Sequence, residues 1–170
     1  MIMADVFKIV FLVLGALLVL EAYWLASAAL FPGWVARARE VYDARPVRAT
    51  LVGALVAAPL GIVGVGAATN APNGALKLVG ALLASVPILL ALGGSTGLAL
   101  RIGAGLALPA DELAPWRRVL RGGIVLSLTF LLPVVGWFVV LPWALVSGVG
   151  AALLALRPAR RAVTAVADVR

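Results

Sequence analysis

The longest uncharged stretch of the chain, Gly122–Leu156, runs for 35 residues without an acidic or basic side chain. A single α-helix of that length would measure about 52 Å, whereas the hydrocarbon core of a bilayer is about 30 Å thick. Proline interrupts a helix because it lacks the amide donor. We therefore predict two helices, about Gly122–Val135 and Val139–Leu156, joined as a full or re-entrant hairpin. Three residues are predicted to form the bend: Pro133, Gly136 and Pro142.

Three further apolar stretches precede this one, and each has about the length that crosses a bilayer once. Sixty-four per cent of the chain is apolar, 12% is charged and the mean hydropathy is +1.15, which excludes an ordinary soluble domain and a disordered chain. We predict an all-α, polytopic transmembrane bundle that forms one integral membrane domain over residues 1–170. The expected spans are about 6–31, 50–69 and 75–100, followed by the hairpin 122–156 and a short basic tail 157–170.

Twelve of the 14 Lys and Arg residues lie in the three segments that connect or follow these stretches. Cytoplasmic segments of membrane proteins carry an excess of Lys and Arg, and a hairpin would place all three segments on one side. We expect an outside N-terminus and a cytoplasmic C-terminus in a bacterial inner membrane. The arginines are interpreted as topology determinants that contact anionic lipid head groups. They are Arg37, Arg39, Arg45 and Arg48; Arg101, Arg117, Arg118 and Arg121; and Arg157, Arg160, Arg161 and Arg170.

Basic segments also bind acidic protein surfaces and nucleic acids. A cytoplasmic acidic partner is the alternative to head groups, and nucleic acid is not expected because no aromatic residues interleave with the arginines. Residues 34–42 are expected to form a short interfacial helix with Val35, Ala38 and Tyr42 facing lipid.

The chain contains no histidine and no cysteine. It therefore lacks the side chains that most often ligate zinc, haem iron or pigment magnesium, and it cannot form a Cys–His pair or a Ser–His–Asp triad. We expect no catalytic residue, no metal site and no cofactor, with bound lipids as the ligands. The chain is accordingly predicted not to be an enzyme.

Glu21 is the single acidic residue inside an expected span. A carboxylate in hydrocarbon is costly, so it is by default a candidate functional residue that accepts a proton or binds a cation. Two structural interpretations stay open: a hydrogen bond to a neighbouring helix, or a position near the membrane interface. The adjacent Tyr23 and Trp24 are of the residue types that are enriched at such interfaces.

Small residues recur at four-residue spacing in three of the expected helices. Small side chains let helix backbones approach closely, which favours association inside a membrane. We predict that they pack helices within this chain, or else form a surface for another subunit. They are Gly53, Ala57 and Gly61; Gly80 and Ala84; and Gly148 and Ala152.

Three sequence segments carry a family resemblance: the arginine-rich lead-in 116–123, the segment Leu-Leu-Pro-Val-Val-Gly-Trp at 131–137, and the glycine-rich stretch 147–151. Over residues 45–156 the chain resembles the small four-helix membrane domain of bacterial proteins associated with bactofilin-type polymer-forming cytoskeletal proteins. The right-handed β-helix found in such proteins is not expected within these residues. The resemblance implies anchoring or scaffolding and transfers no catalytic residue.

The function predicted from these observations is that of a non-catalytic accessory or scaffold subunit. It would pack within or anchor a larger inner-membrane assembly, such as a respiratory or photosynthetic complex or a cytoskeletal anchor. Other integral membrane subunits and anionic lipids are the expected partners, and a homo-oligomer stays open. The alternative is a component of a small ion or solute transporter or channel that uses Glu21.

Overall fold

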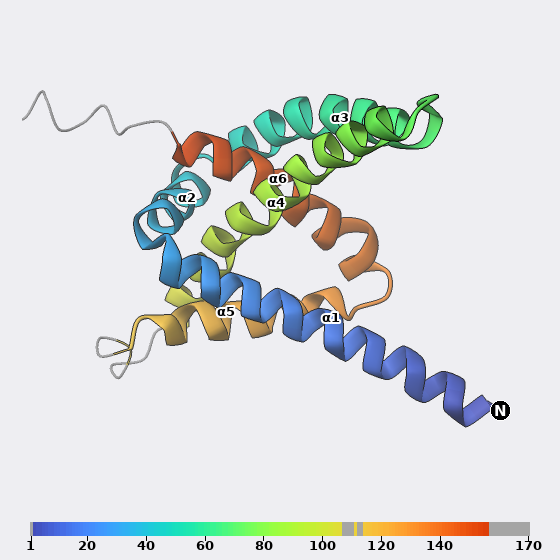
Figure 1. Ribbon diagram of the computed structural model, residues 1–170. Coiled ribbons are helices and arrows are strands. Elements are labelled where there is room, and N and C mark those ends of the chain that lie inside the picture. Colours follow the sequence, from blue (N-terminus) through green and yellow to red (C-terminus); the bar gives the residue numbers. More distant parts are fainter. Residues whose placement is uncertain (1, 107–110, 112–113, 157–170) are drawn as a thin grey trace, which may run out of the picture.

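The computed structural model of the protein describes residues 2–106, 111 and 114–156 (Figure 1). These residues form six α-helices and one π-helical turn, with no strand among them, which confirms the all-α prediction. The elements are α1 (Ile2–Leu30), α2 (Pro32–Ala44), α3 (Pro46–Asn70), α4 (Gly74–Gly105), α5 (Trp116–Phe130), the π-helical turn η2 (Gly136–Val140) and α6 (Leu141–Ala155).

Four helical segments are long and apolar enough to cross a membrane. They are Met3–Leu30, Pro46–Asn70, Gly74–Gly105 and the continuous η2–α6 segment Gly136–Ala155. Helix α5, which is not among these four segments, has 15 residues and is therefore about 22 Å long. The chain is thus a multi-pass membrane protein whose C-terminal pair of helices is unequal in length.

Helices extend beyond the limits expected from charge. Helix α3 starts at Pro46 and α5 at Trp116, so Arg48, Arg117 and Arg118 lie in first helical turns. Arginine is a good helix former, and proline at the start of a helix costs no hydrogen bond. The positions of the basic residues therefore do not mark the ends of these helices.

The predicted bend lies within the expected segment, and of its three predicted residues Pro133 and Gly136 lie at the bend whereas Pro142 does not. Helix α5 ends at Phe130 and the chain turns at residues 131–134, which include Pro133. A Cβ on Gly136 would lie 2.8 Å from the Phe130 carbonyl oxygen, so glycine permits the return of the chain. Pro142 lies instead in the first turn of α6, where a missing amide donor is tolerated.

The C-terminal helices form an open hairpin. Helix α4 packs along both α5 and α6, and the two arms make little direct contact with each other. Figure 1 shows α5 running away from the end where α2 lies, and α6 returning toward it. Helix α6 is the most enclosed of the membrane helices, because α3, α4 and α2 all pack on it.

The short helix α2 does not rest on lipid as expected. Val35, Ala38 and Tyr42 are buried, with Ala38 and Tyr42 fully enclosed, because α2 packs on α4 and α6. The sequence pattern correctly identified an apolar face on this helix, but that face packs on other helices of the protein and not on lipid.

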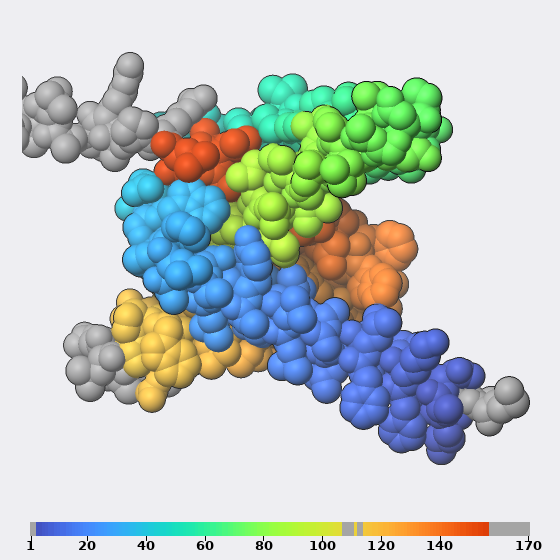
Figure 2. All heavy atoms as spheres, in the orientation of Figure 1, coloured from blue at the N-terminus to red at the C-terminus, as the bar shows by residue number. Residues whose placement is uncertain are grey.

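The first half of α1 stands clear of the bundle. Every residue from Met3 to Leu12 is exposed, and α1 contacts α5, α4 and α2 through its second half. Figure 2 shows this end (dark blue) protruding beyond the rest of the described chain.

Candidate functional site

Eight arginines gather at one end of the bundle, which we call the arginine end. It is formed by α2, the start of α3, the end of α4, the start of α5 and the end of α6 (Figure 1). The residues are Arg37, Arg39, Arg45, Arg48, Arg101, Arg117, Arg118 and Arg121. Arg157, Arg160, Arg161 and Arg170 lie outside the described residues. The first two basic segments share this end because α3 and α4 lie between them and run in opposite directions. The hairpin was predicted to bring the third segment here, and that segment lies outside the described residues.

Helix α2 closes the end of α6. Arg37 Nε donates to the Ala155 carbonyl oxygen (2.8 Å), and Trp34 Nε1 donates to the Ala152 carbonyl oxygen (3.2 Å). The last carbonyls of a helix have no partner within the helix and carry partial negative charge. Arg37 thus has a structural role that the sequence analysis did not assign.

Two acidic residues bind four of the other arginines. Asp43 pairs with Arg39 (3.4 Å) and with Arg101 (2.9 Å), which ties α2 to α4. These three side chains are 39–48% exposed, so the contribution of each pair to stability is small.

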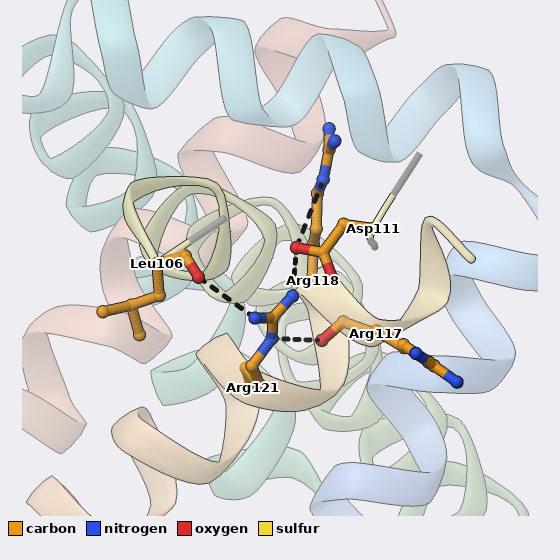
Figure 3. A network of polar contacts seen from close by, with 5 residues as sticks. All are labelled: Leu106, Asp111, Arg117, Arg118 and Arg121. Carbon is orange, nitrogen blue, oxygen red and sulfur yellow. Dashed lines mark hydrogen bonds and ion pairs between the residues drawn. The ribbon is translucent and has the colours of Figure 1, made fainter. Parts of the chain in front are cut away.

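The second acidic residue, Asp111, was not singled out from the sequence and is 2% exposed. It forms ion pairs with Arg121 and with Arg118 (3.9 Å) (Figure 3). Arg121 also donates to the Leu106 carbonyl oxygen (3.1 Å). The network joins the end of α4 to the start of α5, so Arg118 and Arg121 stabilise the connector and are not free for head groups.

Three described arginines form neither an ion pair nor a side-chain hydrogen bond to a helix end among the described residues: Arg45, Arg48 and Arg117, all exposed. Arg117 lies over its neighbour Trp116, with the guanidinium carbon 5.7 Å from the ring centroid. These are the described arginines that remain available to external anions.

Glu21 lies at the contact between α1 and α5. Ser127 Oγ donates to Glu21 Oε1 (3.0 Å), whereas Glu21 Oε2 is buried and has no hydrogen-bond partner among the described residues. This geometry matches the helix–helix hydrogen bond that was one of the open interpretations. Trp24 is 1% exposed, so it packs on protein, and the interpretation of Glu21 as lying near the membrane interface stays a prediction.

Polar–aromatic pairs elsewhere in the bundle escaped the sequence analysis. Trp24 Nε1 donates to Ser95 Oγ (2.9 Å), joining α1 to α4. The Tyr42 hydroxyl lies 3.2 Å from Ser147 Oγ, joining α2 to α6. Burial raises the pKa of Tyr42 to about 12. The signal available in the sequence was a serine within an apolar helix, which does not name its partner.

Most of the predicted small residues lie at helix crossings. Gly53 contacts the α6 backbone at Val146 and Gly150, and Gly148 lies against Ala91 of α4. Gly80 faces Ala67 and Ala68, and Ala84 faces Gly64. Ala152 is fully buried and Ala57 is partly buried. Further close-contact glycines, which the four-residue rule missed, are Gly64, Gly94, Gly97, Gly103, Gly122 and Gly150.

The prediction of packing within the chain is wrong at Gly61, where no neighbouring atom would meet an added Cβ within 4 Å. A strict four-residue step drifts by about 40° per step on a helix of 3.6 residues per turn. Gly61 is therefore rotated by about 80° from Gly53, whereas Gly64 returns to the same face.

Three apolar cavities open on the bundle surface. One of about 500 Å³ lies between the middle of α1 and the 131–141 bend, and one of about 180 Å³ lies among α3, α4 and α6. The third, of about 260 Å³, lies at the arginine end between α1, α2 and α5. No charged side chain lines any of the three. Within the described part of the chain, no group of three acidic residues could hold a metal ion.

Comparison of the chain with protein-family models, with curated proteins and with solved structures finds no match. The function proposed for this multi-pass, all-α membrane protein therefore rests on the geometry of its own structure.

Proposed function

We propose that this protein is a non-catalytic integral membrane subunit that packs within or anchors a larger bacterial inner-membrane assembly. The observation that carries the proposal is the first half of α1. Its ten exposed residues, Met3–Leu12, extend about 15 Å, which is half the thickness of the hydrocarbon core. A helix without neighbours over that distance offers its whole circumference to another membrane helix.

The state of the polar groups also supports a structural role. Glu21 is bound by Ser127, and Trp24 and Tyr42 use their polar atoms to join helices. The cavities have apolar walls and offer no pair of groups for acid–base or nucleophilic chemistry.

The proposed orientation puts the arginine end in the cytoplasm and the N-terminus outside. It rests on the excess of basic residues among the described residues of this end, where eight arginines share the surface with Glu40, Asp43 and Asp111, because such an excess marks the cytoplasmic side. The resemblance to bactofilin-associated membrane domains makes a cytoskeletal anchor one candidate assembly.

The proposal can be tested by photo-crosslinking in native membranes. A photoreactive amino acid would replace Phe11, which is 66% exposed on α1, or Leu55, which is 77% exposed on α3. We expect a discrete protein adduct from position 11 and none from the control position 55. Adducts with lipid alone at both positions would contradict the proposal.

The alternative function, a component of a small transporter or channel, is favoured by one observation: the buried Glu21 Oε2 lacks a partner among the described residues. Glu21→Gln preserves the shape of the side chain and removes its charge. Under the scaffold proposal the variant keeps its assembly and its function. Loss of proton or ion flux in reconstituted vesicles of the variant, with flux present in the original protein, would support the transporter.

A further inference from the structure

The cavity at the arginine end, which we call the arginine-end pocket, differs from the other two in its charged surroundings. Its wall is apolar and includes Leu25, Ala28 and Ala29 of α1, Pro32 of α2, Leu100 of α4 and Trp116 of α5. Trp116, at its edge, is 53% exposed. The pocket therefore brings an apolar volume of about 260 Å³ to the end of the bundle where the positive charge is concentrated.

A cation without an internal partner stands beside this pocket. The Arg117 guanidinium lies over the ring of Trp116, 5.7 Å from its centroid. Figure 3 shows the Arg117 side chain pointing away from Asp111, which pairs with Arg118 and Arg121. Arg117 is exposed and has no ion pair with a described residue. Its charge is thus available at the rim of the pocket.

A ligand that fits both features needs an apolar chain and an anionic group joined to it. We propose that the arginine-end pocket binds an anionic phospholipid, with part of one acyl chain in the pocket and the phosphate on Arg117. Charge complementarity selects this occupant, because eight arginines face three acidic residues among the described residues of this end. The larger cavity beside the 131–141 bend has no basic residue in its wall, so it offers no such selection.

The inference uses the proposed placement of the arginine end at a head-group layer, and it does not depend on the scaffold role. A partner found by crosslinking at α1 would leave it unaffected. Conversely, a lipid site at this pocket would exist in a transporter as well. The two proposals therefore fail separately.

The test uses the full chain reconstituted in phosphatidylcholine vesicles that contain brominated phosphatidylglycerol, whose bromine atoms quench nearby tryptophan fluorescence. The difference between the original protein and Trp116→Phe isolates the signal of Trp116. We expect phosphatidylglycerol to bind at Trp116 about fivefold more strongly than brominated phosphatidylcholine, the ratio expected from one basic residue near an anionic lipid. Arg117→Gln should abolish this preference.

Arg45→Gln is the matched control, since Arg45 is also exposed at this end and also lacks a described ion pair. It should leave the preference unchanged. Ala29→Phe should fill the pocket and reduce quenching by both lipids, because Ala29 is exposed and lines it. Equal effects of the two arginine substitutions, or equal quenching by the two lipids in the original protein, would overturn the site.

Discussion

Gly150 lies at the tightest crossing between α3 and α6, and its replacement by alanine tests the packing argument directly. An added Cβ would overlap the Ala49 carbonyl oxygen and would lie 2.7 Å from the Ala49 carbonyl carbon and 2.8 Å from the Gly53 nitrogen. All three atoms belong to the α3 backbone, so no side chain can move aside. Carbon atoms pack at about 3.5–4.0 Å, so the helices must separate by about 1 Å.

Separation at this point loosens more than one contact. Gly53 lies against Val146 on the same face, and Gly148 and Ala152 hold the other side of α6 against α4. Overpacking of a well-packed core costs about 1–3 kcal/mol, and a backbone-limited crossing belongs at the upper end of that range. At about 2–4 °C per kcal/mol for a chain of this size, a cost of about 3 kcal/mol means that Gly150→Ala should lower the Tm by about 6–12 °C.

The assay is thermal unfolding of the purified chain in mild detergent, with Gly61→Ala as the matched control. Both glycines are inside helices, but Gly61 faces open space. Alanine is favoured over glycine in a helix by about 0.5–1 kcal/mol, so Gly61→Ala should leave the Tm unchanged or raise it slightly. A similar loss of Tm in both variants would refute the argument from contact geometry.

Three further predictions concern the arginine end. Asp111→Asn removes the counter-charge of Arg118 and Arg121 and should lower the free energy of unfolding by about 2 kcal/mol, measured by thermal unfolding. This is less than the roughly 3–5 kcal/mol lost with a fully buried pair, because the two arginines are 31% and 26% exposed. A variant as stable as the original protein would contradict this prediction. Burial raises the pKa of Tyr42 to about 12 from 10.0. The corresponding contribution to the free energy of unfolding, about 3 kcal/mol, is complete below pH 10 and is lost as the pH rises through about 12. An absorbance titration of tyrosinate, compared with Tyr42→Phe, should show that Tyr42 ionises only as the pH approaches 12. Trp34→Phe removes the donor to the Ala152 carbonyl and should cost about 1 kcal/mol, with faster hydrogen exchange at the end of α6; unchanged exchange would count against this cap.

The all-α membrane architecture could be predicted from the sequence because it follows from the length of uncharged stretches. The four-residue spacing also predicted crossings at Gly53, Gly80 and Gly148. It could not give the rotation of each helix, which depends on tertiary contacts; hence Gly61 was included and Gly64 was missed. The amphipathic pattern of α2 likewise could not distinguish lipid from protein as the cover of its apolar face.

The polar contacts were predicted less well because hydrogen bonds and ion pairs join residues far apart in the sequence. Ser127 lies 106 positions from Glu21 and Ser95 lies 71 from Trp24. The arginines were treated as one class by charge count. The structure divides them into those that bind Asp43, Asp111 or the end of α6 and those that remain available, such as Arg117.

The position of α6 in the bundle constrains the order of assembly during synthesis. It is the most enclosed membrane helix, yet it follows in sequence every helix that packs on it. Until the ribosome releases α6, the glycine-containing faces of α3 and α4 contact lipid acyl chains at the positions that the α6 backbone occupies in the native fold. Since α3 and α4 also pack directly on each other, this pair can associate first, and the native tertiary structure is complete only when α6 packs against both.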